Sequence, residues 1–144
     1  MISRTGRLLA LDWGEVRIGV AVCDETQLIA SPRATLTRRA GKRFPMPSFL
    51  ALVEQERPVG LIVGLPLTAE GSEEAAAGSA REMGTLASAR TQLPIEFVDE
   101  RFSTARALGA IREMEGSIRG RKADVDALAA AVMLQQFLDM RRKR

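Results

Sequence analysis

The spacing of apolar runs changes part-way along the chain, and this change predicts a mixed α/β architecture. In the first part, short apolar runs follow one another through turns, which is typical of antiparallel strands. In the second part, apolar runs alternate with helical patterns, which is typical of parallel strands joined by helices. The predicted strands cover residues 7–11, 18–23, 27–36, 59–65 and 95–98, and the predicted helices cover residues 48–56, 72–90, 104–114 and 123–140.

Individual residues refine this pattern. Gly14 and Gly19 are interpreted as sources of flexibility for the turn between the first two strands, which form a β-hairpin. Pro32 restricts the third strand to an edge or a strand end, and Ser48 is the predicted N-cap of the first helix. The uninterrupted apolar run 59–65 predicts a strand buried on both faces. Residues 127–134 are apolar all round, which predicts a buried helix.

Four acidic side chains lie at or just beyond the ends of predicted elements. Asp12 ends the first strand, Asp99 and Glu100 follow the last strand, and Asp126 falls in the first turn of the last helix. In open α/β sheets, sites form outside the carboxyl ends of the strands. If the first, fourth and fifth strands are parallel neighbours, Asp12 and the Asp99–Glu100 pair converge. Asp126 joins them if its helix docks at the same edge.

The chemistry that such a cluster suits is the binding of Mg²⁺ or Mn²⁺. Several carboxylates in one pocket repel one another unless a cation neutralises them, and these ions take oxygen ligands, including phosphate oxygens. Two such ions stabilise both the attacking and the leaving oxygen when a phosphodiester is hydrolysed. The chain has no histidine and one cysteine, so histidine-based catalysis is excluded and a zinc site is disfavoured. Cys23 lies in an apolar run and is expected to be a buried small hydrophobe.

Each acid also has an ordinary structural explanation. Asp12 can bond the backbone of its own turn, and Asp99 can pair with Arg101. Asp124 and Asp126 can each stabilise the N-terminus of the last helix through its dipole. The residues alone do not choose between Asp124 and Asp126 as a metal ligand.

The basic residues are clustered, although the net charge is only +3. Residues 33–43 contain five basic residues and no acidic one, residues 101–122 contain six basic residues against two acidic ones, and the tail of about residues 140–144 ends in four basic residues. This distribution favours a polyanionic partner. The length predicts a single domain over residues 1–144. No apolar run approaches the roughly 20 residues that span a bilayer, so we expect no membrane partner and a cytoplasmic location.

Four motifs occur in the order and spacing of a known family. They cover residues 9–22 (LALDWGEVRIGVAV), residues 63–67 (VGLPL) with Gly71, residues 98–104 (VDERFST), and Asp126 with Ala129, Ala130 and Leu134. In these motifs the chain resembles the YqgF/RuvX family of pre-16S rRNA nucleases, which is also described as Holliday-junction resolvase-like. The resemblance implies a ribonuclease H-like fold, with a five-stranded mixed sheet of strand order 3-2-1-4-5 flanked by helices.

The resemblance also implies roles for particular residues. The residues that match its acidic positions, and that would be catalytic and bind Mg²⁺ or Mn²⁺, are Asp12, Glu100 and Asp126. The residues that fall where substrate-facing basic side chains are expected are Arg17, Arg101 and Lys122.

The function implied by the resemblance is that of a metal-dependent endonuclease on structured nucleic acid. The expected reaction is 5′-end maturation of pre-16S rRNA, with a ribosomal precursor particle as an additional partner. One alternative is a resolvase of four-way DNA junctions, which would need paired active sites, so the chain is expected to be a monomer or a homodimer. Another alternative is a non-catalytic RNA-binding ribosome-assembly factor.

Overall fold

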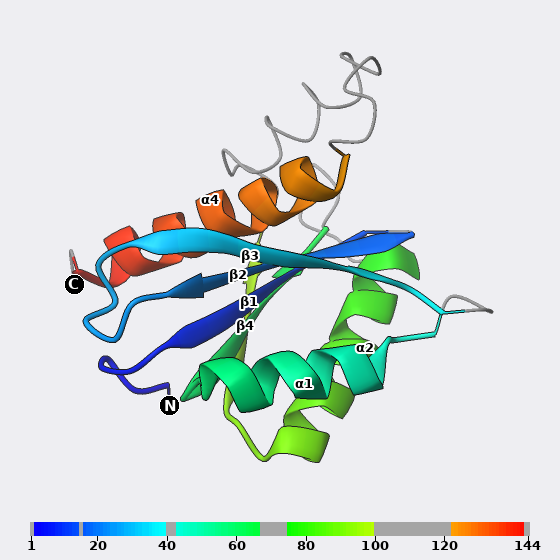
Figure 1. Cartoon of the computed structure of the whole chain (residues 1–144), viewed down its shortest axis with the longest axis horizontal. Coiled ribbons are helices and arrows are strands. Elements are labelled where there is room, and N and C mark those ends of the chain that lie inside the picture. Colours follow the sequence, from blue (N-terminus) through cyan, green and yellow to red (C-terminus); the bar gives the residue numbers. More distant parts are fainter. Residues whose placement is uncertain (1, 15, 40–42, 67–74, 100–121, 143–144) are drawn as a thin grey trace.

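A five-stranded mixed sheet forms the centre of the computed structural model, which describes residues 2–14, 16–39, 43–66, 75–99 and 122–142 (Figure 1). The elements are β1 (Leu8–Trp13), β2 (Arg17–Cys23), β3 (Ala30–Thr37), α1 (Met46–Glu56), β4 (Gly60–Leu65), α2 (Ala75–Thr91), β5 (Ile95–Asp99) and α4 (Lys122–Arg142). The strand order is β3-β2-β1-β4-β5. Strand β1 pairs antiparallel with β2 and parallel with β4, and β4 pairs parallel with β5. The predicted sheet order and the predicted change from antiparallel to parallel pairing are confirmed.

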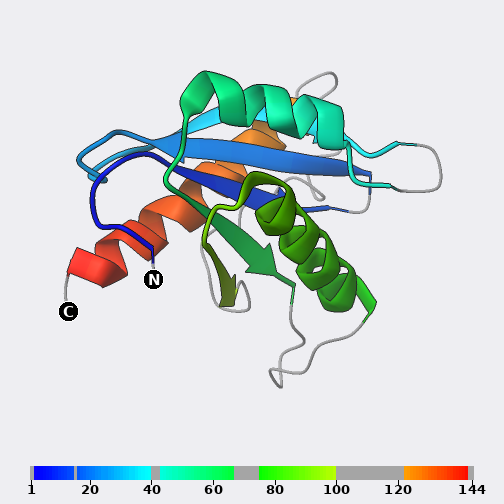
Figure 2. The ribbon, with the colours of Figure 1, turned by 90° about the horizontal axis from the view of Figure 1, so that it is seen from below.

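The sheet separates two hydrophobic cores. Helices α1 and α2 cover one face and α4 covers the other, as Figures 1 and 2 show from two directions. Side chains alternate between the two cores along β1: Leu9, Leu11 and Trp13 pack on the α1–α2 face, whereas Leu8 and Ala10 pack on the α4 face. All six residues of β4 are buried, which explains its uninterrupted apolar run.

The third strand lies at the edge of the sheet, as its proline predicts. The register of the β2–β3 pair shifts between Val20 and Ala21, and Pro32 is the partner of Ala21 at this irregularity. An edge strand has a neighbouring strand on one side only. A proline, which has no N–H to donate, is tolerated where its nitrogen faces the open side or lies at an irregularity. The burial of Cys23 is likewise confirmed: its sulfur accepts a hydrogen bond from the N–H of Leu8 at 3.2 Å, and burial raises the pKa of its thiol.

Two helix predictions are wrong in detail. Helix α1 begins at Met46 rather than after a Ser48 cap, and no side chain caps it. Pro47 in the first turn has no N–H that needs a cap, so a helix can begin there without one. Helix α4 is not buried all round, because Leu128 is 43% exposed on the side away from the sheet. The predicted helix 104–114 lies outside the described residues.

No helix in the part of the chain that the structure describes is both long enough and apolar enough to cross a membrane.

Glu56 joins three elements at the end of α1. Its carboxylate accepts a hydrogen bond from Nη1 of Arg7 at 2.7 Å and another from Nε of Arg33 at 2.6 Å. Only 11% of the Glu56 side chain is exposed, so the pair of arginines compensates a mostly buried charge. The hydrogen bond from Arg33 is the largest cause of a lowered Glu56 pKa, and the bond from Arg7 adds to it against the opposing effect of burial.

We expect Glu56→Gln to lower the free energy of unfolding by about 2 kcal/mol at neutral pH, because two charge-assisted hydrogen bonds are weakened. Folding lowers the pKa of Glu56 below its ordinary value of 4.5, so its stabilisation is present above that pH and is lost as the pH falls through the lower native pKa. Urea unfolding at several pH values should therefore show the two proteins converging in acid. The exposed Glu54→Gln on the same helix is the control, and an equal effect from it would contradict the prediction.

Candidate active site

The carboxyl ends of three parallel neighbouring strands form one edge of the sheet. Strand β1 lies beside β4, and β4 lies beside β5. In register, Asp12 is level with Gly64 of β4, and Gly64 is level with Val98 of β5. The geometric condition for convergence of Asp12 with the residues after β5 is thus met. Asp99 itself ends β5 and is exposed.

Asp12 is flanked by glycine on both neighbouring strands. Its register partners are Gly19 on β2 and Gly64 on β4, so neither neighbouring strand places a side chain beside it at that level. Register partners project from the same face of a sheet, and Asp12 continues the alternation in which Ala10 packs on the α4 face. The Asp12 side chain therefore lies on the face that α4 covers.

Gly19 is the point where α4 meets the sheet. A Cβ atom on Gly19 would lie 2.0 Å from the backbone oxygen of Asp126 and 2.5 Å from its carbonyl carbon. The first turn of α4 thus rests directly on the β2 backbone, beside Asp12 on the next strand. The interpretation of Gly19 as a turn residue was wrong: it lies inside β2, and the reason for glycine is this close approach.

Asp126 is buried at this edge and carries an arginine counter-ion. Its Oδ2 accepts a hydrogen bond from Nε of Arg17 at 2.7 Å, and 11% of its side chain is exposed. An ionised carboxylate with so little exposure requires such a partner. Arg17 begins β2, and 32% of its side chain remains exposed. The sequence predicted that Arg17 faces the substrate. In the structure, its Nε instead donates to Asp126, an acid of the candidate site.

The remaining predicted residues are not placed at the site. Glu100 and Arg101 lie outside the described residues, as do the side chains of Lys122 and Asp124. Among the residues that are described, no three His, Cys, Asp or Glu side chains are grouped so that they could hold a metal ion. Asp99 therefore does not complete such a group with Asp12 and Asp126. Two carboxylates suit the oxygen preference of Mg²⁺ or Mn²⁺, but a third ligand must come from elsewhere.

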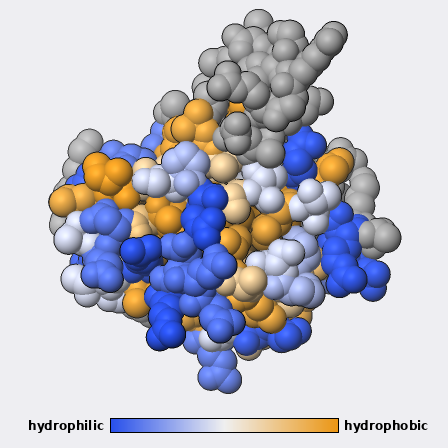
Figure 3. All heavy atoms as spheres, in the orientation of Figure 1, coloured by the Kyte–Doolittle hydropathy of each residue, from blue (hydrophilic) through white to orange (hydrophobic). Residues whose placement is uncertain are grey.

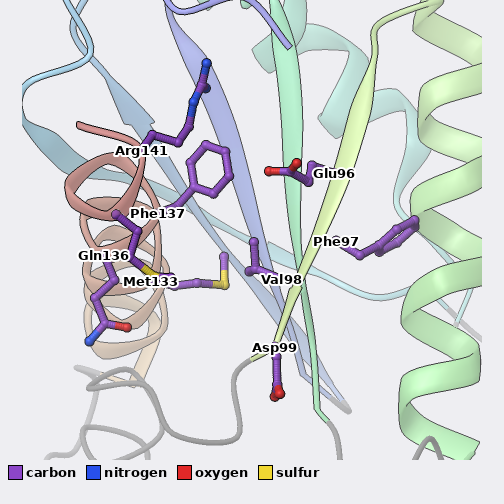
Figure 4. A pocket seen from close by; sticks show the side chains of 9 residues that line it. Glu96, Phe97, Val98, Asp99, Met133, Gln136, Phe137 and Arg141 are labelled. Carbon is purple, nitrogen blue, oxygen red and sulfur yellow. The ribbon is translucent and has the colours of Figure 1, made fainter. Parts of the chain in front are cut away.

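A cleft of about 350 Å³ lies on the same face between β5 and α4, but it contains neither Asp12 nor Asp126. Figure 4 shows Val98 and Glu96 directed toward α4, whereas Phe97 points toward α2. Across the cleft, the guanidinium of Arg141 lies 5.2 Å from the ring centroid of Phe137. Its apolar lining continues the α4 core, so the cleft is distinct from the carboxylate pair.

The turn after Asp12 is held by a residue whose role the sequence did not indicate. Arg38 donates from Nη1 to the carbonyl of Gly14 at 3.0 Å, and its guanidinium lies 4.3 Å from the ring centroid of Trp13. The sequence showed Arg38 only as a member of a basic cluster. The one available signal was the aromatic residue directly after Asp12, to which an arginine can stack.

Comparison with known proteins identifies the family. A family model described as "RuvX: Holliday junction resolvase" matches residues 6–140.

The chain belongs to the RuvX family.

This confirms the resemblance and makes the chain an enzyme of the nuclease class, which hydrolyses phosphodiester bonds. A relative from Koribacter versatilis is 38% identical over 136 residues, covering 94% of this chain and 88% of the relative. One from Roseiflexus sp. is 37% identical over 142 residues, covering 99% of this chain and 100% of the relative. Both are named "Putative pre-16S rRNA nuclease".

A solved structure shares the fold of this RuvX family member. It is Thermus thermophilus RuvC in complex with a Holliday junction substrate, with a TM-score of 0.59 and coverage of 95% of this chain and 96% of that chain. The sequence identity is 15%, so the likeness concerns the fold alone. Together with the strand order, it confirms the predicted ribonuclease H-like fold.

We expect Gly19→Ala to lower the free energy of unfolding by about 3 kcal/mol or more, because the added methyl group would displace the first turn of α4 from β2. The displacement would also separate Asp126 from Asp12, so nuclease activity should fall even where the protein remains folded. Gly78→Ala is the matched control, since a Cβ on Gly78 in α2 meets nothing within 4 Å. Replacing a helical glycine should stabilise the protein by about 0.5–1 kcal/mol. Urea unfolding that ranks the two variants equally would contradict this account of Gly19.

Proposed function

We propose that this nuclease is a metal-dependent endonuclease that cuts phosphodiester bonds in structured nucleic acid. The observation that carries the proposal is the close approach of the Asp126 backbone to Gly19, which is the register partner of Asp12 on the neighbouring strand. Glu100 is the proposed third carboxylate. It directly follows Asp99, the last residue of β5, and β4 lies between β5 and β1 in the sheet. Three carboxylates suit a hard divalent cation and a phosphate substrate.

The proposed substrate is the precursor of 16S rRNA, cut to form its 5′ end. The names of the relatives from Koribacter and Roseiflexus support this choice. It also implies a cytoplasmic location and a ribosomal precursor particle as partner, because bacterial rRNA is transcribed and assembled there. The description of the family and the fold of RuvC favour a second candidate, the resolution of four-way DNA junctions. That reaction cuts two strands and would require a homodimer.

In this proposal Asp12, Glu100 and Asp126 hold Mg²⁺ or Mn²⁺. When bound, the metal supplies positive charge to the phosphate and lowers the pKa of a water molecule. The protein itself contributes one carboxylate from strand β1 and one from helix α4, whose backbone packs on the neighbouring strand. Arg17 neutralises Asp126 and, through its exposed part, is positioned to donate to a phosphate oxygen. Further substrate contacts are proposed for Arg101 and Lys122.

The experiment that tests the function compares cleavage of pre-16S rRNA, single-stranded RNA and four-way DNA junctions, with Mn²⁺ and with EDTA. Metal-dependent cleavage of the rRNA precursor alone supports the proposal. Cleavage of junctions alone supports the resolvase. Tight RNA binding without cleavage of any substrate would refute the proposed endonuclease activity and would support a non-catalytic assembly factor.

We expect Asp12→Asn to reduce Mn²⁺-dependent cleavage by about 10³-fold or more, because one ligand charge is lost from the site. The change is nearly isosteric, so urea unfolding and RNA binding should stay close to those of the wild type. Asp139→Asn provides the control, since it removes the same charge from the other end of α4, where the side chain is 46% exposed. A pure Asp12→Asn protein that cleaves at the wild-type rate would refute the metal-site proposal.

The same assay distinguishes the two acids of the first turn of α4. Asp126 is buried beside Asp12, so Asp126→Asn is expected to reduce cleavage about as strongly as Asp12→Asn. Asp124→Asn is expected to retain activity within about tenfold, as for a residue that acts on the helix dipole. The reverse ranking would assign the ligand role to Asp124.

A further inference from the structure

We call the end of the sheet that carries Asp12 and Asp126 the carboxylate edge. A short arm beside it is attached to the β1–β2 turn. We define the β3–α1 arm as residues Arg38, Arg39, Arg43 and Phe44, which lie between β3 and α1. The backbone N–H of Arg38 donates to the carbonyl of Val16 at 2.9 Å, and its guanidinium donates to the carbonyl of Gly14 at 3.0 Å. The first end of the arm is thus attached on both sides of this turn.

Both ends of the arm also contact Trp13, the residue after Asp12. The Arg38 guanidinium lies 4.3 Å from the ring centroid of Trp13, which favours a cation–π contact. Phe44, at the other end, is buried and stacks on Trp13 with ring centroids 6.3 Å apart, and it meets Phe49 of α1 edge-on. The arm is therefore held at a defined position relative to the strand that carries Asp12.

Between these anchors the arm presents two exposed arginines side by side. The N–H of Arg39 donates to the carbonyl of Arg43 at 2.9 Å, and the two residues form an antiparallel bridge. Side chains of directly opposed residues lie close together on one face. A phosphate group that lies across both side chains could accept hydrogen bonds from both guanidinium groups.

The arm lies on the same side of the molecule as the end of β1. Figures 1 and 2 both show the connection from β3 to α1 extending beyond the turn between β1 and β2. In Figure 3, some hydrophilic side chains lie on that side, at the right, although a larger hydrophilic area lies at the left and centre of the view. Arg33, which belongs to the same basic cluster, instead donates to Glu56 and Gln55 of α1.

We propose that Arg39 and Arg43 form a clamp for the phosphate backbone of the nucleic-acid strand next to the carboxylate edge, and that Arg38 is a positioning residue that holds the clamp. This inference rests on the proposed function, since it assumes a nucleic-acid substrate at that edge. Guanidinium groups donate two parallel hydrogen bonds to phosphate oxygens, which gives each arginine both affinity and orientation. Phosphate contacts fix the register of a strand without reading its sequence.

The test measures binding of a fluorescein-labelled stem–loop RNA and a labelled four-way DNA junction by anisotropy in EDTA buffer, across a range of salt concentrations. The double variant Arg39→Gln/Arg43→Gln should bind roughly tenfold or more weakly at low salt. The slope of log affinity against log salt should become shallower by about 1.4–1.8, since each lost phosphate contact contributes about 0.7–0.9.

The matched control is Arg57→Gln/Arg90→Gln. This variant also removes two positive charges. Both arginines are exposed and precede β4 and β5, so they lie near the amino ends of the parallel strands, away from the carboxyl ends. An unchanged salt slope in the arm variant, or an equal change in the control, overturns the clamp.

Arg38→Gln separates the two roles. It should weaken binding while leaving the salt slope near that of the wild type, because Arg38 contacts Trp13 rather than phosphate. A slope reduced by about 0.7–0.9 would overturn its positioning role. Binding is measured without metal, so the outcome is distinct from that of the nuclease test. A wild type that binds through the arm but cleaves nothing supports the clamp and refutes the nuclease.

Discussion

The contact between the first turn of α4 and the backbone of Gly19 is the constraint on which the site depends. Asp126 reaches the carboxylate edge only because β2 has no side chain at that point. Asp12 lies on the neighbouring strand at the same level, so one missing methyl group determines the spacing of two acids. Arg17, two residues before Gly19, then neutralises the buried Asp126. Packing and electrostatics at the edge are thus consequences of one close approach.

The two residues at the end of β1 serve the two faces of the sheet. Alternation along the strand directs Asp12 to the α4 face and Trp13 to the α1–α2 face, where Trp13 joins the core and holds Arg38 and Phe44. A carboxylate site and a basic arm are therefore built from consecutive positions of one rigid, buried strand. In the proposed function, a nucleic-acid strand that crosses this edge would meet carboxylates for the metal and arginines for its phosphates.

Stability and the site draw on separate parts of the molecule. The Glu56 cluster fastens α1 to the start of β1 and to β3, away from the carboxyl ends of the parallel strands. The two apolar cores on either side of β1 and β4 provide the rigid support that a preorganised site requires. A change at Glu56 is therefore expected to act on the free energy of unfolding, whereas a change of the Asp12 carboxylate is expected to act on the activity.

By itself, the sequence determined the strands and, through the family motifs, their order in the sheet. It also determined the edge position of the strand with Pro32 and the position of Asp12 near the end of β1. These features are local: apolar periodicity and backbone restriction act within a few residues. Only the tertiary structure decided the role of Gly19, the start of α1 at Met46 rather than after Ser48, the exposure of Leu128, and the pairing of Arg17 with Asp126. Arg17 and Asp126 are 109 residues apart, and no local pattern records which distant backbone will rest on a given glycine. Such contacts arise because the burial of whole elements brings remote segments together.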